Sequence, residues 1–92
     1  MRWETILRVK AKFVADVADA INKGKAEVKE WYDKMLADNY GVDGSIEVVE
    51  VIERPRSVVV VVEGPDVRVN VVSDALERVV PGHYDVGFPY WS

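Results

Sequence analysis

Five consecutive valines, at positions 58–62, place the tightest constraint on what this chain can fold into. Valine branches at its Cβ atom, which favours the extended backbone of a β-strand. Successive side chains of a strand point to opposite faces of its sheet, so this run is apolar on both faces. A sheet with two apolar faces has to be covered on both. We therefore predict a central strand over residues 57–63, with helices on one face and, on the second face, either the chain's own aromatic tail or another chain.

Two further segments have strand character. Residues 46–53 alternate loosely between apolar and polar, and residues 67–72 alternate cleanly. The links contain Pro55 and Pro65, at positions where tight turns accept proline. Because consecutive strands with short links form antiparallel hairpins, we predict a three-stranded antiparallel meander. Its register stays open, and the residues beside the valines on the second face are either Val49 and Val51 or Ile46, Val48 and Ile52.

The first 38 residues fit two patterns. An apolar stripe with alternating spacings of four and three runs from Trp3 to Met35, which is typical of a helix. Residues 3–13 also alternate as a half-buried strand does, and the sequence leaves both structures open for them. We favour the helix because its pattern continues over three times the length. Glycine is unfavourable inside a helix, so we predict one N-terminal helix, or two helices broken near Gly24, with Gly41 closing the second.

A short helix and an aromatic tail complete the predicted chain. Ser73 and Asp74 are good helix caps, Asp74 and Glu77 have the spacing of a capping box, and Pro81 with Gly82 ends the helix. The predicted fold class is α+β, with a single domain over residues 1–82 and a tail over residues 83–92. This order of elements loosely resembles that of double-stranded-RNA-binding domains and small phage tail-completion proteins. The resemblance concerns the fold alone.

Composition excludes several classes of protein. The chain has 92 residues, enough for one domain, and its net charge is −4. Without cysteine it has no disulfide framework, no thiolate metal site and no thiol nucleophile. The N-terminus lacks the apolar region of a signal peptide, and the longest apolar run, of five residues, is too short to span a bilayer. We therefore expect a cytoplasmic or other intracellular protein that does not bind membranes.

The sequence carries no recognisable catalytic constellation, metal site or cofactor site. His83 is the one histidine and follows the Pro81–Gly82 pair, so a multi-histidine zinc site is excluded. The serines lack a nucleophile-elbow motif, and no glycine-rich phosphate loop is present. Glu50 and Glu53 lie three positions apart, which places them on opposite faces of a strand. We expect a protein that is not an enzyme and has no cofactor or small-molecule substrate.

The surfaces that remain favour binding to another macromolecule. Aromatic side chains bury a large area with few rotors, so rings in an extended tail are suited to anchor a partner. We predict a non-catalytic interaction or assembly module that associates with itself or binds another protein, as a small phage-type accessory or structural protein would. A homodimer is the simplest form. The predicted partner-binding residues are Tyr84, Phe88, Tyr90 and Trp91 in the tail and Val49, Val51, Val59 and Val61 on the second sheet face.

The alternative function is nucleic-acid binding through basic residues of the N-terminal helices and the first hairpin turn. Lysine and arginine side chains contact phosphates, and spacings of four align them along a helix. Acidic residues are interspersed among these bases, as on an ordinary solvated surface. The residues of this alternative are Arg8, Lys12, Lys25, Lys29, Arg54 and Arg56.

Overall fold

The valine run forms the central strand of the sheet, as predicted. A computed structural model describes residues 1–89, and its sheet has the order β1-β3-β2. Strand β3 (Ser57–Glu63) pairs antiparallel with β1 (Arg2–Arg8) on one side and with β2 (Glu47–Arg54) on the other. A two-residue turn at Pro55 and Arg56 joins β2 to β3. The three-stranded antiparallel sheet is therefore confirmed, although its strands do not follow in chain order as a meander would.

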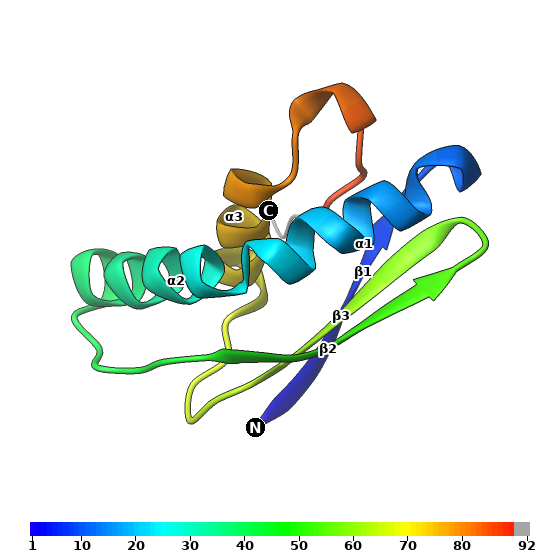
Figure 1. Ribbon diagram of the computed structural model, residues 1–92. Helices are drawn as coiled ribbons and strands as arrows, with labels where there is room; N and C mark the ends of the chain where they lie inside the picture. The colour runs from blue at the N-terminus through cyan, green and yellow to red at the C-terminus, as the bar shows by residue number, and fades with distance from the viewer. Residues whose placement is uncertain (90–92) are drawn as a thin grey trace.

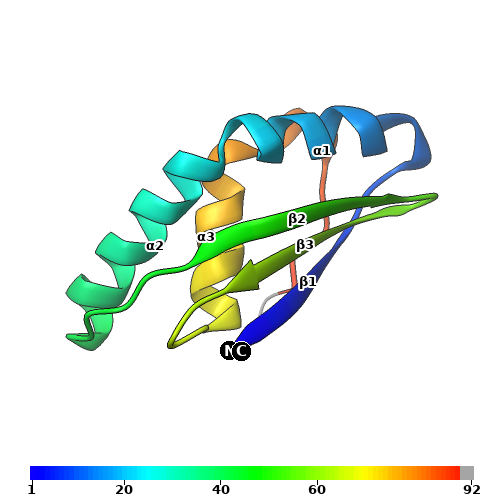
Figure 2. The ribbon, with the colours of Figure 1, turned by 60° about the horizontal axis from the view of Figure 1, so that its bottom comes forward.

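All the α-helices of residues 1–89 lie on one face of this sheet (Figures 1 and 2). The first two, α1 (Val14–Lys23) and α2 (Lys25–Tyr40), connect β1 to β2, and α3 (Val69–Val79) follows β3. Two short 3-10 helices, η1 (Ala11–Phe13) and η2 (Gly82–Tyr84), precede α1 and follow α3. The predicted α+β class is confirmed.

The hydrophobic core lies between the helices and one face of the sheet. From β3, the side chains of Val58, Val60 and Val62 belong to this core, together with buried residues of all three helices. The buried helix residues are Val14, Val17, Ala18, Ile21, Val28, Tyr32, Leu36, Val71, Val72, Ala75 and Leu76.

Residues 2–8 form a strand, so the helix predicted over residues 3–13 is wrong at its start. The burial alternates as a strand requires: Thr5 and Leu7 are buried, whereas Glu4 and Arg8 are exposed. The reason is that β3 requires a hydrogen-bonding strand on each of its two sides. A strand whose side chains are apolar throughout is stable in the middle of a sheet, where hydrogen-bonding strands lie on both of its sides. The N-terminal segment forms the strand on one of these sides, and the helical stripe begins after it.

Residues 67–72 do not form the predicted third strand of a meander. Helix α3 begins at Val69, so Ser73 and Asp74 lie inside the helix rather than at its cap, and Arg68 is the N-cap residue. Strand β1 already occupies the side of β3 on which this segment would have paired. The valines of residues 67–72 also fit the apolar stripe of a helix. Their packing on the core as a helix outweighs the β propensity of valine.

The predicted helix break at Gly24 is confirmed, and packing requires a glycine at this position. The backbone torsion φ of Gly24 is −97°, which any residue adopts. A Cβ atom at this position would instead lie 2.7 Å from the Cβ atom of Val79, where the junction of α1 and α2 meets the end of α3. Gly41 caps α2 in the left-handed conformation, with φ of 63°, as predicted. The predicted end of α3 before Pro81 is also confirmed.

The described part of the tail packs on its own chain. Gly87 pairs with Arg8 at the end of β1, with N–H to O distances of 3.0 and 2.8 Å. The ring of Tyr84 lies 5.1 Å from that of Phe13, and the Ser73 hydroxyl donates a hydrogen bond of 2.9 Å to the carbonyl oxygen of Pro89. Up to Pro89, the tail therefore runs beside the edge of β1 and on the helix side of the sheet.

Candidate protein-interaction surface

The second face of the sheet, called the open face here, points away from the helices. Since Val58, Val60 and Val62 point into the core, residues 57, 59, 61 and 63 and their cross-strand partners point the other way. Neither a helix nor the tail up to Pro89 lies on this side (Figures 1 and 2). The sequence predicted an apolar face that something covers. Within residues 1–89, the structure leaves it uncovered.

Side chains of the open face form four rows that cross the three strands. The outer row is Arg2, Glu63 and Glu47; the acidic row is Glu4, Val61 and Glu50; the apolar row is Ile6, Val59 and Ile52; and the basic row is Arg8, Ser57 and Arg54. Neighbouring rows are two residues apart along each strand, which corresponds to about 7 Å. The acidic and basic rows therefore lie on opposite sides of the apolar row, each about 7 Å from it.

The two valines at the centre of this face are buried although no element of residues 1–89 covers them. Val59 is 0% exposed and Val61 1% exposed, whereas Ile6 on the flanking strand is 51% exposed. Longer side chains of β1 and β2 flank both valines, with Ile6 and Ile52 beside Val59 and with Glu4 and Glu50 beside Val61. The apolar surface that remains accessible is therefore concentrated on the flanking residues, chiefly Ile6.

The predicted residues of β2 are divided between the two faces by a β-bulge. The pairing shifts between Val48 and Glu50, so Val49 is an extra residue, and its side chain is 40% exposed. Val48 and Val51 pack against the helix-side core, and Ile52 lies beside Val59. Neither predicted register is correct, because the bulge changes which residues face the helices part-way along the strand.

The predicted aromatic anchors do not gather on the open face. Tyr84 and Phe88 are partly buried and pack against the helix-side core. Tyr90 and Trp91 lie outside the described residues. Of the predicted partner-binding set, Val59 and Val61 are the two that the structure places at the centre of the open face.

The basic residues of the nucleic-acid alternative separate into two groups. Arg8 and Arg54 form the basic row, and Arg56 lies beside them, since its carbonyl oxygen accepts a hydrogen bond from the Val9 N–H at 3.1 Å. Lys12 lies in η1, with its ammonium group 5.0 Å from the centre of the Phe13 ring. Lys25 and Lys29 lie on α2, and the Lys29 ammonium group donates a hydrogen bond to the Ser45 hydroxyl.

A hollow of about 580 Å³ adjoins this basic end of the sheet. Arg8, Lys10 and Arg56 line it together with the carboxylate of Asp85 and the backbone of Gly87. The side chains are long and exposed, and the one acid lies among them. This end of the molecule is therefore positively charged at its surface but does not form an enclosed anion site.

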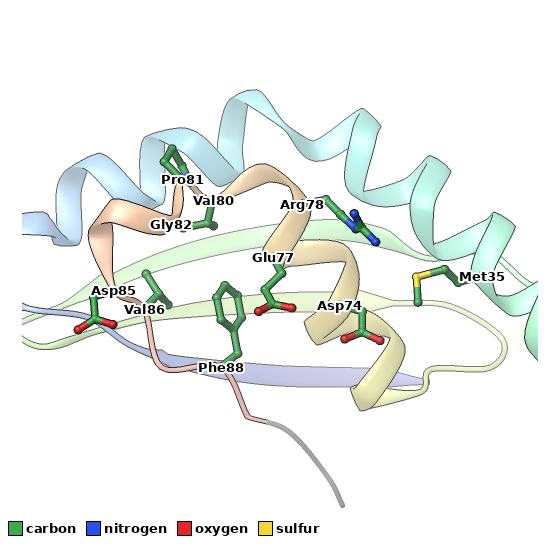
Figure 3. Close-up of a pocket in the computed structure, with 10 residues that line it drawn as sticks. All are labelled: Met35, Asp74, Glu77, Arg78, Val80, Pro81, Gly82, Asp85, Val86 and Phe88. Carbon is green, nitrogen blue, oxygen red and sulfur yellow. The ribbon is translucent and has the colours of Figure 1, made fainter.

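A second hollow, of about 600 Å³, lies between α3 and the tail. Figure 3 shows the carboxylates of Asp74 and Glu77 beside the ring of Phe88, with Asp85 at the far end. Arg78 points away from these acids, and its guanidinium carbon lies 4.4 Å from the centre of the Trp31 ring. The hollow is acidic on one side, but it contains no histidine, and no nucleophile is paired with a base.

Metal-binding side chains do not gather in the part of the chain that the structure describes. No set of three metal-ligating side chains comes together in this range. His83 is exposed, and its ring centre lies 4.2 Å from that of Tyr84. None of the described helices is both long enough and apolar enough to cross a bilayer. Burial raises the pKa of Tyr32, but this phenol lies in the core, away from both hollows.

Sequence reasoning missed the residues that give the open face its pattern. The favoured helical pattern includes Glu4 and Ile6, and the sequence singles out Glu50 only together with Glu53, as carboxylates on opposite faces of a strand. The alternation of residues 3–13 is the signal that identifies Glu4, Ile6 and Arg8 as neighbours on one face of a strand. The bulge at Val49 has no comparable signal, because four of the five residues from Val48 to Ile52 are apolar.

Comparisons with known proteins found no match among family models, curated proteins or solved structures. The function therefore has to be argued from the geometry of this chain. The feature that stands out is the open face, with its central apolar row and two flanking rows of opposite charge.

Proposed function

We propose that this chain is a non-catalytic protein-interaction module that binds its partner through the open face. The observation that carries the proposal is the apolar row Ile6, Val59 and Ile52, which lies in the middle of a sheet face without cover from residues 1–89. An antiparallel sheet can leave one face to water, but such a face is normally polar throughout. In this row the side chain of Ile6 is 51% exposed, and it is instead suited to a partner that removes it from water.

The charged rows support a protein partner over a nucleic acid. Arg8 and Arg54 are suited to phosphates, but Glu4 and Glu50 lie two rows away, at about 13 Å. A nucleic-acid backbone that crossed the face along the strands would contact both rows, and the acidic row would repel it. A protein surface carries charges of both signs and can match both rows.

A photo-crosslinking residue on the open face tests the proposal. We would place it at Ile52 and, as the matched control, at Glu27, which is exposed on α2. Both proteins would be irradiated alone at high concentration and in an extract of the source cells. We expect protein adducts from position 52 and none from position 27. The additional substitution Ile6→Asp, in the same row, should abolish these adducts while far-UV circular dichroism stays unchanged.

Three results would contradict the proposal. The first is no adduct from position 52 under either condition. The second is an equal set of adducts from position 27, which would indicate non-specific contact. The third is a nucleic-acid adduct from position 52 whose yield falls as the salt concentration during irradiation rises, which would favour the basic end of the sheet as the functional surface.

A further inference from the structure

We infer that the partner of the open face is a second copy of this chain, bound face to face about a two-fold axis that crosses the three strands along the apolar row. This inference rests on the proposed function. It adds the identity of the partner and the register of the contact, and both follow from the order of the four rows.

A two-fold axis in this direction reverses the strands but keeps their order across the sheet. Each strand then lies opposite its own copy, and rows at equal distances from the axis exchange places. With the axis on the apolar row, Ile6, Val59 and Ile52 each face the same residue of the second copy. The acidic row of each copy faces the basic row of the other, because the two rows are equally far from the apolar row.

The exchange brings together opposite charges on both flanking strands. On β1, Glu4 faces Arg8 of the second copy, and on β2, Glu50 faces Arg54 of the second copy. The symmetry produces each pair twice, so four pairs of opposite charge surround the apolar centre. The outer row, of mixed charge, lies near the hairpin turn of the second copy. The face is thus complementary to itself, which is the requirement for a two-fold contact.

These charges form no ion pair among the residues that the structure describes. Among residues 1–89, the ion pairs join Lys23 with Asp19, Lys29 with Asp33, and Arg68 with Asp66. None of the four charged residues of the acidic and basic rows takes part. Within one copy, the apolar row holds the acids about 13 Å from the bases, which is too far for an ion pair. A second copy supplies partners that the fold itself does not.

The twist of the sheets does not disrupt this match. Stacked sheets cross at about −30°, with a separation of about 10 Å. At about 7 Å from the axis, such a rotation displaces a charged row by only about 3–4 Å relative to its partner row. The side chains of arginine and glutamate are long enough to compensate for that displacement.

The size of the face predicts a weak dimer. Three strands of about seven residues cover about 14 Å by 24 Å. The flat area of such a contact is about 670 Å² for the two copies together, which is smaller than that of a stable specific interface, usually near 1,600 Å² in total. We therefore expect a dissociation constant in the micromolar range, with a dimer that weakens as salt screens the charged rows.

Paired charge reversals test the contact. The variant Glu4→Arg/Glu50→Arg carries a face with two basic rows, and Arg8→Glu/Arg54→Glu carries one with two acidic rows. We expect each variant alone to dimerise at least about 100-fold more weakly than the parent chain, since like charges would face each other. An equimolar mixture of the two should form a heterodimer. Sedimentation velocity from 5 to about 500 μM would measure the masses.

Two controls exclude an effect of net charge. Glu27→Arg/Glu30→Arg changes two exposed acids of α2, and it shifts the net charge from −4 to 0 as the first variant does. It should dimerise as the parent chain does. The fourfold reversal Glu4→Arg/Glu50→Arg/Arg8→Glu/Arg54→Glu keeps the net charge at −4. It should recover the dimer, because the two rows have only exchanged places. Circular dichroism and thermal unfolding would show that each variant is folded.

Each outcome decides the inference. A heterodimer formed only from the mixture supports it, as does recovery in the fourfold variant. A parent chain that stays monomeric to about 500 μM overturns it, and protein adducts from position 52 in a cell extract would then still support the broader proposal. A dimer that ignores the charge reversals also overturns it, because the contact would lie on another surface.

Discussion

The hydroxyl of Tyr32 donates a hydrogen bond of 2.6 Å to the carbonyl oxygen of Asp66, across 34 positions of the sequence. The hydroxyl oxygen of Tyr32 in turn accepts a hydrogen bond of 2.9 Å from the N–H of Arg68, the N-cap residue of α3. Tyr32 is itself 0% exposed. One phenol on α2 therefore joins two backbone groups of the segment that leads from β3 into α3, and it fixes where that helix begins.

Replacement of this tyrosine should destabilise the fold. Tyr32→Phe keeps the ring in the core but leaves a donor and an acceptor of the 66–68 segment without their partner. We expect a loss of about 1–3 kcal/mol in the free energy of unfolding. Tyr40→Phe is the matched control, because its hydroxyl bonds Asn70 at the exposed surface, and it should cost less than about 0.5 kcal/mol. Urea unfolding followed by circular dichroism would compare the two, and equal effects would contradict the role assigned to Tyr32.

The same phenol should make stability depend on pH at the alkaline end. Burial raises the pKa of Tyr32 above its ordinary value of 10.0, against the opposing effect of the Arg68 N–H. Above pH 10 the unfolded chain releases this proton while the folded chain retains it, so the unfolded state gains stability. The advantage of the parent chain over Tyr32→Phe should therefore be constant below pH 9 and shrink as the pH rises past 10. A difference that stays constant to pH 11 would contradict this expectation.

How much of this fold could be predicted depends on how local its determinants are. The central position of β3 follows from the valines of residues 58–62 alone, and the end of α2 follows from Gly41. The break at Gly24 follows from the low helix propensity of glycine. The structure adds that a side chain at this position would clash with Val79, which is far away in the sequence. These features need no knowledge of which segments meet.

The features that were predicted wrongly depend on a competition between distant segments. Residues 2–8 and residues 67–72 both have strand character, and one position beside β3 remained after β2 had paired with it. The N-terminal segment takes that position, and Val69 then begins a helix on the core. The pattern of the open face could not be predicted from the sequence for the same reason, because its rows exist only once β1 is known to pair with β3.

A side chain at position 24 should disturb the packing of the helices. In Gly24→Ala the new Cβ atom would lie 2.7 Å from the Cβ atom of Val79, closer than carbon atoms approach, so α3 would have to shift. The gain in helix propensity is about 1 kcal/mol, and we expect the clash to exceed it, for a net loss of about 1–2 kcal/mol. Gly82→Ala meets no atom within 4 Å and is the control. A stabilised Gly24→Ala variant would contradict this expectation, because it would show that α3 shifts at little cost in free energy.

Removal of one buried hydroxyl should stabilise the protein. Thr5 is 1% exposed on the helix side of β1, and its Oγ1 atom has no hydrogen-bond partner among residues 1–89. Thr5→Val replaces that hydroxyl with a methyl group of similar shape and keeps the branched Cβ that strands favour. We expect a gain of about 1 kcal/mol in the free energy of unfolding. Ser73→Ala is the contrast, since its hydroxyl does have a partner in Pro89, and it should lose about 1 kcal/mol.

Truncation of the tail after Gly82 should lower stability without affecting association. Tyr84, Val86 and Phe88 pack against the helix-side core, and Gly87 extends the pairing of β1 at Arg8. Loss of three partly buried apolar side chains should reduce the free energy of unfolding by about 2–4 kcal/mol. The open face is left intact, so at 10 °C the folded truncated chain should dimerise with the affinity of the full chain. Thermal unfolding and sedimentation velocity on both chains would measure the two quantities. A truncated chain that remains folded but monomeric, where the full chain is a dimer, would show that the tail itself joins the two copies.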